Sequence, residues 1–319
     1  MKSFTKTTVS VLLAAAVATS AAALSFGAHA AEDRIRLIVR NDTYSTAQGA
    51  GWDGVLLDES VPISETGDAL STVKQALAAA DKNLVTVDSQ WGSYISAVEG
   101  VAENDAATYS GWMGVQNDWV VNNNLAYIML RDGDTFELCY SVTMGTDIGA
   151  DWTNDSTALK ALSVEGVTLN ESFAPSDTDY TVTLGNESKT VFVKPTADNK
   201  YYQVRSYLND YKPSEYGFRS TDPIEVKAGD ILYIGVGNEN WPGSYPAETV
   251  YCVHFMSDDV QMGDVNFDGK LDIIDATLIQ YASIDLVPFS TLQKKLADYN
   301  SDGRMSILDT TAIQHAVSN

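Results

Sequence analysis

The sequence predicts a multidomain chain in which a mixed α+β region is followed by an all-β region and then by a small α-helical region. Three observations lead to this prediction. Residues 31–146 combine an apolar strand pattern with one stretch of helical spacing, and residues 158–256 alternate in short runs separated by turns. Residues 263–319 contain the same acidic loop twice, each time followed by apolar residues at helical spacing.

The first thirty residues have the organisation of a secretory signal peptide. Lys2 and Lys6 precede an apolar run that starts at Val9, and Ala28-His29-Ala30 supplies small residues at a cleavage site. We therefore expect residues 1–30 to be removed and the mature chain to be secreted. No other segment approaches the roughly 20 consecutive apolar residues that span a bilayer, so we expect no membrane insertion.

The chain is strongly acidic, with a formal net charge of -23. Such a charge disfavours nucleic acid and anionic membranes as partners, and favours solubility and binding of divalent cations. Cys139 and Cys252 each lie within an apolar alternating run. We predict two buried thiols on strands, and neither a disulfide framework nor a zinc site.

Residues 31–146 are predicted to form a small α+β domain. A strand covers residues 35–40, and a helix is expected around residues 68–81. Its apolar face holds Leu70, Val73, Leu77 and Ala80. The run LAYIML at residues 125–130, an Arg131-Asp132-Gly133-Asp134 turn and the run TFELCYSV predict a hairpin.

Two stretches of this domain, YSGWMGVQNDWVVNNN and LRDGDTFELCYS, resemble a bacterial domain of unknown function akin to the C-terminal β-domain of transcobalamin. The resemblance implies a β-grasp-like fold. Asn117-Asp118 and the following VVNNN depart from the short turn usual in that family. A corrinoid ligand is one function that the family suggests, but the helical domain that encloses much of that ligand is missing here.

Residues 147–157 are polar and are predicted to be a linker. Short strands then follow one another: LSVEGVTL, DYTVTL, KTVFVKP, YYQVRSYL, DPIEVKAGD, ILYIGVG and TVYCVHF. Strands of this length and frequency predict a β-sandwich over residues 158–256. The segment LKALSVEGVTLNESFAPSDTDYTVTL resembles the opening of cadherin-like sandwich domains of bacterial surface proteins, which act as spacers or binders.

A second linker, residues 257–262, precedes a repeat that predicts calcium binding. Of the seventeen residues starting at Asp264 and at Asp298, nine are identical. Each copy offers oxygen ligands at positions 1, 3, 5, 9 and 12 and a glycine at position 6, which allows the turn around the ion. The predicted ligands of two ions are Asp264, Asn266, Asp268, the Lys270 carbonyl, Asp272 and Asp275, and Asp298, Asn300, Asp302, the Arg304 carbonyl, Ser306 and Asp309.

A loop followed by an exiting helix, without an obvious entering helix and given twice, resembles a dockerin from Gly263 to the end of the chain. Dockerins fold around calcium and bind cohesin domains of a scaffoldin, the organising protein of cellulosomes and amylosomes. The resemblance places the cohesin contacts at Ile273, Ile274, Gln280, Tyr281, Ile307, Leu308, Gln314 and His315. In an alternative interpretation, the Ile and Leu pairs are simply the core of this small domain.

Catalysis finds little support in the sequence. The mature chain has only His254 and His315 to serve a nucleophilic triad, and neither lies in a recognisable motif. Acidic residues are abundant, so a pair of glycosidase carboxylates is not excluded. Two domains that resemble non-catalytic modules leave no room for a barrel or a large cleft, and we therefore expect no catalytic residues.

Carbohydrate binding is better supported, because sugars stack on exposed aromatic rings. The candidates are Trp52, Trp91, Trp112, Trp119, Tyr201, Tyr202, Tyr211, Tyr216 and Trp241. We expect a secreted, non-catalytic subunit of a scaffoldin-based complex that binds starch or plant cell wall polysaccharide. A small glycoside hydrolase or an enzyme regulator, delivered by the dockerin, is the alternative.

Overall fold

The computed structural model describes residues 32–185, 187–212, 215–237 and 249–318, so the predicted signal peptide lies outside the described residues. Asp33–Asn319 clusters as one compact unit. Within it, the N-terminal region (residues 33–141) and the two-sheet region (residues 159–256) are mostly β-structure. The dockerin-like segment (residues 257–318) is helical.

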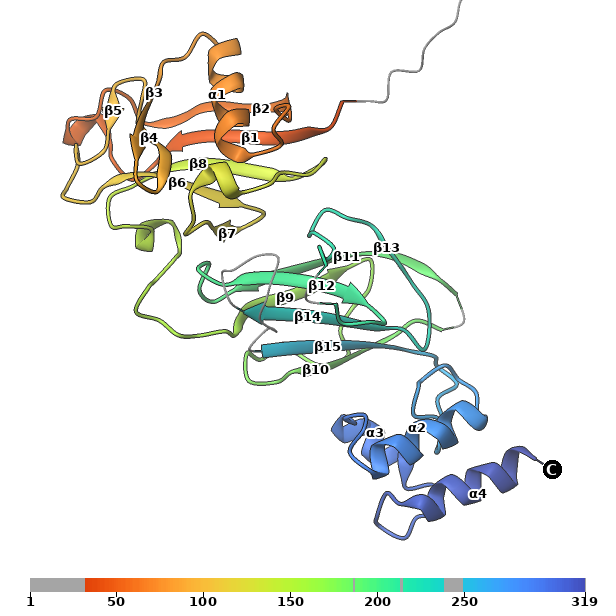
Figure 1. Cartoon of the computed structure of the whole chain (residues 1–319). Coiled ribbons are helices and arrows are strands. Elements are labelled where there is room, and N and C mark those ends of the chain that lie inside the picture. The colour runs from red at the N-terminus through yellow and green to blue at the C-terminus, as the bar shows by residue number, and fades with distance from the viewer. Residues whose placement is uncertain (1–31, 186, 213–214, 238–248, 319) are drawn as a thin grey trace, which may run out of the picture. The chain divides into compact units, whose positions relative to one another are not determined.

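The N-terminal region is built on a five-stranded sheet with the order β2-β1-β8-β6-β7 (Figure 1). Its strands are β1 (Arg34–Asn41), β2 (Gly54–Pro62), β6 (Gly111–Gln116), β7 (Trp119–Val120) and β8 (Thr135–Ser141). β1 and β8 run parallel, while the other pairs are antiparallel. A second sheet holds β3 (Leu84–Ser89), β4 (Gly92–Val98) and β5 (Val101–Ala102).

Helix α1 (Ala69–Ala79) covers the predicted range almost completely. Asp68 caps it by accepting a hydrogen bond from the Ser71 amide at 2.8 Å, which satisfies one of the first free N–H groups of the helix. Leu70, Val73 and Leu77 are buried with residues of the five-stranded sheet in one core cluster. The helical spacing therefore identified both the helix and its buried face.

The hairpin predicted over residues 125–142 is wrong. Leu125–Tyr127 form a short 3₁₀ helix that the Asn124 side chain caps, and Ile128 accepts a hydrogen bond from the Ala69 amide at 2.8 Å. The apolar residues of this run thus cover α1, and β8 pairs with β1 and β6 instead. An apolar run of six residues can form a strand or a buried turn, and here it forms a turn that packs on α1.

The two-sheet region closely follows the predicted strands. One sheet has the order β10-β15-β14-β12 and the other the order β13-β11-β9, and both contribute to a single core cluster. The strands are β9 (Leu159–Glu165), β10 (Asp179–Thr183), β11 (Lys189–Ala197), β12 (Gln203–Leu208), β13 (Ile224–Val226), β14 (Ile231–Gly237) and β15 (Thr249–Met256). The β-grasp-like and cadherin-like assignments remain predictions.

Residues 142–158 connect the two regions and are held at several points. The sequence includes a short 3₁₀ helix, Thr146–Ile148, and Ala150 is fully buried. The Asn199 side chain accepts a hydrogen bond from the Asp151 amide at 3.0 Å and donates to the Asp151 and Asn154 carbonyls. A polar composition here reflects hydrogen bonding to the two-sheet region.

The dockerin-like segment contains α2 (Ile273–Ser283), α3 (Thr291–Ala297) and α4 (Ile307–Val317). Helices α2 and α4 pack on each other through a small core. Its buried apolar residues are Val265, Ala276, Ile279, Ala282, Phe289, Ala297 and Ile313. No helix among the described residues has the length and apolarity needed to cross a membrane.

Candidate functional site

The first acidic loop runs from Asp264 to Asp275 and leads into α2. Asp264 Oδ2 accepts a hydrogen bond from the Gly269 amide at 2.9 Å, and Asp268 Oδ1 accepts one from the Lys270 amide at 2.9 Å. Asp275 Oδ1 accepts from the Val265 amide at 3.0 Å and from the Asn266 amide at 3.3 Å. These bonds wrap the loop around its own carboxylates.

The second loop, from Asp298 to Asp309, has the same arrangement. Asp298 Oδ2 accepts from the Gly303 amide at 2.9 Å, and Asp302 Oδ1 accepts from the Arg304 amide at 3.0 Å. Asp309 Oδ1 accepts from the Asn300 amide at 3.1 Å. The sequence repeat is therefore also a repeat of the local hydrogen bonding.

The carboxylates of the first loop have the electrostatics of a cation site. Asp264 and Asp275 are fully buried, and Asp264 Oδ1 has no hydrogen-bond partner. Burial, with repulsion from Asp275 and Asp268, raises the pKa of Asp264 to about 6. Burial likewise raises the pKa of Asp275. A bound calcium ion would offset both the burial and the repulsion, so these residues fit that ion.

The remaining predicted ligands are Asn266, the Lys270 carbonyl and Asp272 in the first loop, with Asn300, the Arg304 carbonyl and Ser306 in the second. Asp272 and Ser306 also cap α2 and α4, accepting hydrogen bonds from the Ile274 amide at 2.7 Å and the Leu308 amide at 3.2 Å. No group of three or more acidic, histidine or cysteine side chains has metal-binding geometry in the described part of the chain. The individual ligand roles thus stay predictions.

The residues that the dockerin resemblance assigns to cohesin contact are all exposed. Ile273 and Ile274 have exposed fractions of 54% and 52%, and Ile307 and Leu308 have 50% and 61%. None of the four belongs to the buried core of the segment. The alternative interpretation of these pairs as core residues is therefore wrong, and each of the helices α2 and α4 begins with an uncovered apolar pair.

The two loops differ in what precedes them. Helix α3 ends at Ala297, directly before Asp298, so the expectation that neither loop has an entering helix is wrong for the second loop. The first loop follows strand β15 and a short turn. It rests on the two-sheet region through Phe267, whose ring centroid lies 5.3 Å from that of His254 in an edge-to-face arrangement. This contact was not predicted, although an apolar residue, Phe267, stands between two predicted calcium ligands, Asn266 and Asp268.

Three of the candidate tryptophans have structural partners. Trp52 and Trp112 stack with ring centroids 5.8 Å apart, and their indole N–H groups donate to the Val98 and Val101 carbonyls. Trp119 is only 5% exposed and donates to the Tyr201 carbonyl at 3.1 Å. Buried tryptophans normally find such partners, and these rings therefore help to hold the fold.

The other aromatic candidates are dispersed. Trp91 is 75% exposed and Tyr216 is 44% exposed. Tyr201 makes edge contacts with Trp152 and Tyr202, and Tyr211 makes one with Tyr207. Trp241 lies outside the described residues.

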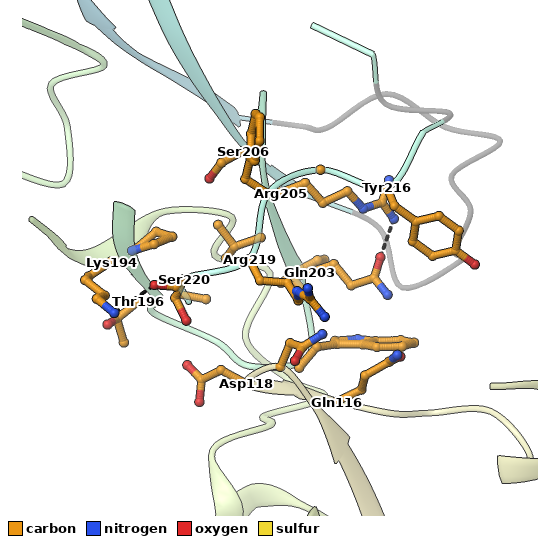
Figure 2. A pocket seen from close by; sticks show the side chains of 18 of the residues that line it. Gln116, Asp118, Lys194, Thr196, Gln203, Arg205, Ser206, Tyr216, Arg219 and Ser220 are labelled. Carbon is orange, nitrogen blue, oxygen red and sulfur yellow. Dashed lines mark hydrogen bonds between the residues drawn. The ribbon is translucent and has the colours of Figure 1, made fainter. Parts of the chain in front are cut away.

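Two cavities collect aromatic side chains. The first, which we call the aromatic hollow, has a volume of about 350 Å³ and is lined by Tyr94, Tyr109, Trp112 and Trp152 together with Glu103 and Asn104. The second, the cationic cavity (Figure 2), has a volume of about 330 Å³. Trp119, Tyr202 and Tyr216 are among the residues that line it. Tyr94 and Tyr109 were missed in the sequence, although each lies three residues from a candidate tryptophan, Trp91 or Trp112.

The described groups offer little for nucleophilic catalysis. His254 lies on β15 and is buried, and neither ring nitrogen has a hydrogen-bond partner. Both cysteines are free thiols on strands, as predicted, but only Cys139 is buried and Cys252 is half-buried. Burial raises the pKa of Cys139 to about 11 and that of Cys252 to about 12, so both thiols remain protonated near neutral pH. A nucleophilic cysteine, in contrast, reacts as the thiolate.

Comparison with known proteins identifies one segment. Residues 262–318 match the dockerin type I domain family. No curated protein sequence matches the chain. A solved structure titled "Crystal Structure of Haptocorrin in Complex with Cbi" is similar at 15% identity, with a TM-score of 0.28, and the match covers 34% of this chain and 25% of that chain. A TM-score this low carries no argument about fold or ligand, and the transcobalamin resemblance stays a prediction.

The family match agrees with the duplicated loops, the exiting helices and the fit of Asp264 to a cation. Dockerin type I domains bind calcium and dock to cohesins, which makes calcium the cofactor and cohesin the partner that this segment implies. Proteins that carry such domains are typically extracellular and associated with a scaffoldin. The C-terminal segment of this chain, residues 262–318, is a dockerin type I domain.

Proposed function

We propose that the chain is a secreted, non-catalytic component of a scaffoldin-based complex that degrades polysaccharides. Its dockerin binds two calcium ions and one cohesin, and its N-terminal regions bind polysaccharide. The observation that carries this proposal is the repeated geometry of the dockerin. Two loops with matching hydrogen bonds each lead into a helix whose first turn exposes an apolar pair.

The cohesin contact is assigned to these pairs and to the polar residues further along each helix. Burying one large aliphatic side chain contributes about 1.5–3 kcal/mol, so either pair can supply a substantial part of a docking energy. Gln280 and Tyr281 on α2 correspond to Gln314 and His315 on α4, and all four are exposed. The near-equivalence of the two faces supports docking through either one.

Binding to a panel of cohesins, measured by calorimetry with calcium and with a chelator, tests the docking. We expect binding only with calcium. Ile273→Asp and Ile307→Asp should each leave binding within a few-fold, because the other face remains, whereas the double variant should lose at least 100-fold. Val55→Asp, an exposed position in the N-terminal region, is the matched control. Full affinity of the double variant would refute the assigned faces.

The polysaccharide contact is assigned to the aromatic hollow. Tyr109 is 72% exposed and Trp152 is 40% exposed, so their rings can accept the apolar face of a sugar. Glu103 and Asn104 line the same hollow and supply polar partners for hydroxyl groups. Starch and plant cell wall glycans are the substrates proposed for this surface.

Affinity electrophoresis of the chain in gels that contain amylopectin, xylan or β-glucan tests this assignment. We expect retardation in one gel without release of reducing sugar, and loss of retardation in Tyr109→Ala and Trp152→Ala. Tyr127→Ala, which removes a ring that is 66% exposed outside the hollow, should behave like the parent chain. Release of reducing sugar would favour the enzyme alternative, and unchanged retardation of both variants would move the glycan site elsewhere.

A further inference from the structure

The cationic cavity has a charge opposite to that of the whole chain. It lies between residues 116–119 and Arg131 of the N-terminal region and strands β11 and β12 of the two-sheet region (Figure 2). Among the described residues, its lining contains four cations, Arg131, Lys194, Arg205 and Arg219, and one acid, Asp118. The chain as a whole has 43 acidic side chains and 20 lysines and arginines. A local excess of positive charge is therefore a specific feature of this cavity.

Part of this charge is already paired and holds the walls in place. Arg219 lies 3.1 Å from Asp134 and 2.9 Å from Asp222, and thereby connects the two regions. Lys194 donates to the Ser220 carbonyl at 2.7 Å. Asp118, the one acid in the lining, is paired with Lys200. Its charge is therefore offset by a cation that is not in the lining.

Arg131 is the cation that remains available to an anion. Its guanidinium carbon lies 4.1 Å above the ring centroid of Tyr216, which orients the side chain without neutralising it. Arg131 Nε is buried and has no hydrogen-bond partner, and no described carboxylate lies within ion-pair distance of the side chain. A buried, unpaired N–H donor of a cation is costly, and an anionic ligand would satisfy it.

Arg205 reinforces this position. It donates a hydrogen bond to Gln203 Oε1 (Figure 2), and burial lowers its pKa to about 10. A guanidinium with this pKa still carries its charge at neutral pH, but it is poorly hydrated. An anion that entered the cavity would restore the favourable electrostatics that burial removes.

The rest of the lining fits a sugar ring. Tyr202 and Tyr216 supply aromatic surface beside the nearly buried Trp119, and Gln116 and Gln203 supply amide donors and acceptors for hydroxyl groups. A volume of about 330 Å³ is at the small end of ligand pockets, which suits one or two sugar units. Aromatic surface, amides and an unpaired guanidinium together match a sugar that carries a carboxylate.

We propose that the cationic cavity binds a uronate unit of an acidic glycan, with the carboxylate on Arg131 and Arg205 and the sugar ring against the aromatic wall. The inference relies on the proposed polysaccharide binding for the class of ligand. It concerns a cavity distinct from the aromatic hollow, and therefore either site can fail without the other.

Calorimetric titration of the chain, without its predicted signal peptide, with di- and trigalacturonate tests the proposal. The methyl esters of the same oligomers are the matched ligands, because esterification removes only the charge. Calcium is held equal in cell and syringe, and the salt is 0.15 M. We expect the acidic oligomers to bind at least tenfold more tightly than their esters, and the difference to shrink as salt rises.

Variants connect the binding to the cavity. Arg131→Gln should weaken uronide binding at least tenfold, and Lys194→Gln should weaken it less, because Lys194 already donates to Ser220. Lys189→Gln, an exposed lysine on the same strand, should change affinity less than twofold. Thermal unfolding of each variant shows whether the fold is retained, and retardation in neutral-glycan gels shows whether the aromatic hollow is intact.

Equal affinity for acid and ester, or full affinity in Arg131→Gln, would overturn the proposal. Absence of binding at millimolar oligomer would overturn it as well. Inorganic phosphate that competes as strongly as digalacturonate would show that the cavity recognises small anions and not a sugar acid. A failure in any of these ways leaves cohesin docking and the aromatic hollow untouched, since both have separate assays.

Discussion

The two acidic loops of the dockerin have matching internal bonds and different surroundings. In the first loop, Phe267 is 1% exposed, contacts His254 and accepts a hydrogen bond at its carbonyl from the Ser257 amide at 2.9 Å. Its counterpart in the second loop, Ser301, is exposed. Both residues have a positive φ, 63° and 60°, so the backbone is the same at this point. The two loops therefore share their backbone conformation at this point, whereas the ring contact with His254 is made by the first loop.

Removal of calcium should have the largest effect and should break the equivalence of the loops. Crowded carboxylates repel one another without the ion, so we expect α2 and α4 to lose their protection while α1 keeps its own. Calcium at a hundredfold excess over its dissociation constant adds about 2.7 kcal/mol per site. Amide hydrogen exchange with and without a chelator measures the loss of protection. We expect the first loop to retain more protection than the second, because Phe267 packs on His254. Equal loss in both loops would show that this contact carries no stability.

Phe267→Ala should be the most damaging single substitution in the loops. Truncating a buried phenylalanine typically costs about 3–5 kcal/mol, whereas an exposed Ser301→Ala change should stay within about 0.5 kcal/mol. Chemical denaturation of the calcium-loaded protein, followed by the NMR signals of residues in α2, compares the stability of the two variants. Similar stability of both would mean that the contact with His254 is not formed in solution.

The twelfth residue of each loop provides a test of internal equivalence. Asp275 accepts from the Val265, Asn266 and Asp272 amides, and Asp309 accepts from the Asn300 and Ser306 amides. Each buried donor left without a partner costs about 1–3 kcal/mol. Asp275→Ala and Asp309→Ala should therefore both reduce stability by a few kcal/mol in chemical denaturation of the calcium-loaded protein. A neutral result for either would show that these bonds are not formed.

His254→Leu should have the smallest effect and should sharpen the account of the contact with Phe267. The two ring nitrogens are buried and have no hydrogen-bond partner, and the nearest carboxylate oxygen, on Asp179, is 3.7 Å away. An apolar side chain of similar size keeps the contact with Phe267 and removes two unsatisfied groups. We expect stability to be unchanged or raised by about 1 kcal/mol in thermal unfolding, with His315→Leu as an exposed control. A clear loss would indicate that the imidazole has a polar partner in solution.

The sequence was most informative where the physics is local. Helix α1 follows from its apolar spacing and the Asp68 cap, and β10, β11, β14 and β15 follow from alternation between turns. The dockerin loops follow from ligand spacing alone. Each of these features depends on residues that are close in the chain, and such patterns are visible without knowing the fold.

The sequence was least informative where distant residues meet. Strand β3 is largely exposed, and β4 is buried mainly in its second half, so their sheet was not predicted. Trp112 was proposed for ligand contact because of its glycine neighbours; it lines the aromatic hollow, but its stacking on Trp52, which is distant in the sequence, was not predicted. The cationic cavity combines Arg131 with residues more than sixty positions later, and no local pattern signals that meeting.

Strand β15 has a mechanical consequence for the proposed role. It lies between β10, to which it is parallel, and β14, to which it is antiparallel, and it leads into the dockerin. In a subunit held by a scaffoldin at its C-terminus and by an insoluble glycan through its N-terminal regions, tension would pull β15 along its own axis. Both ladders would then be loaded in shear, with many hydrogen bonds sharing the force at once. Because β15 is hydrogen-bonded on both sides, the strand that leads into the dockerin has a high resistance to being pulled out of the sheet.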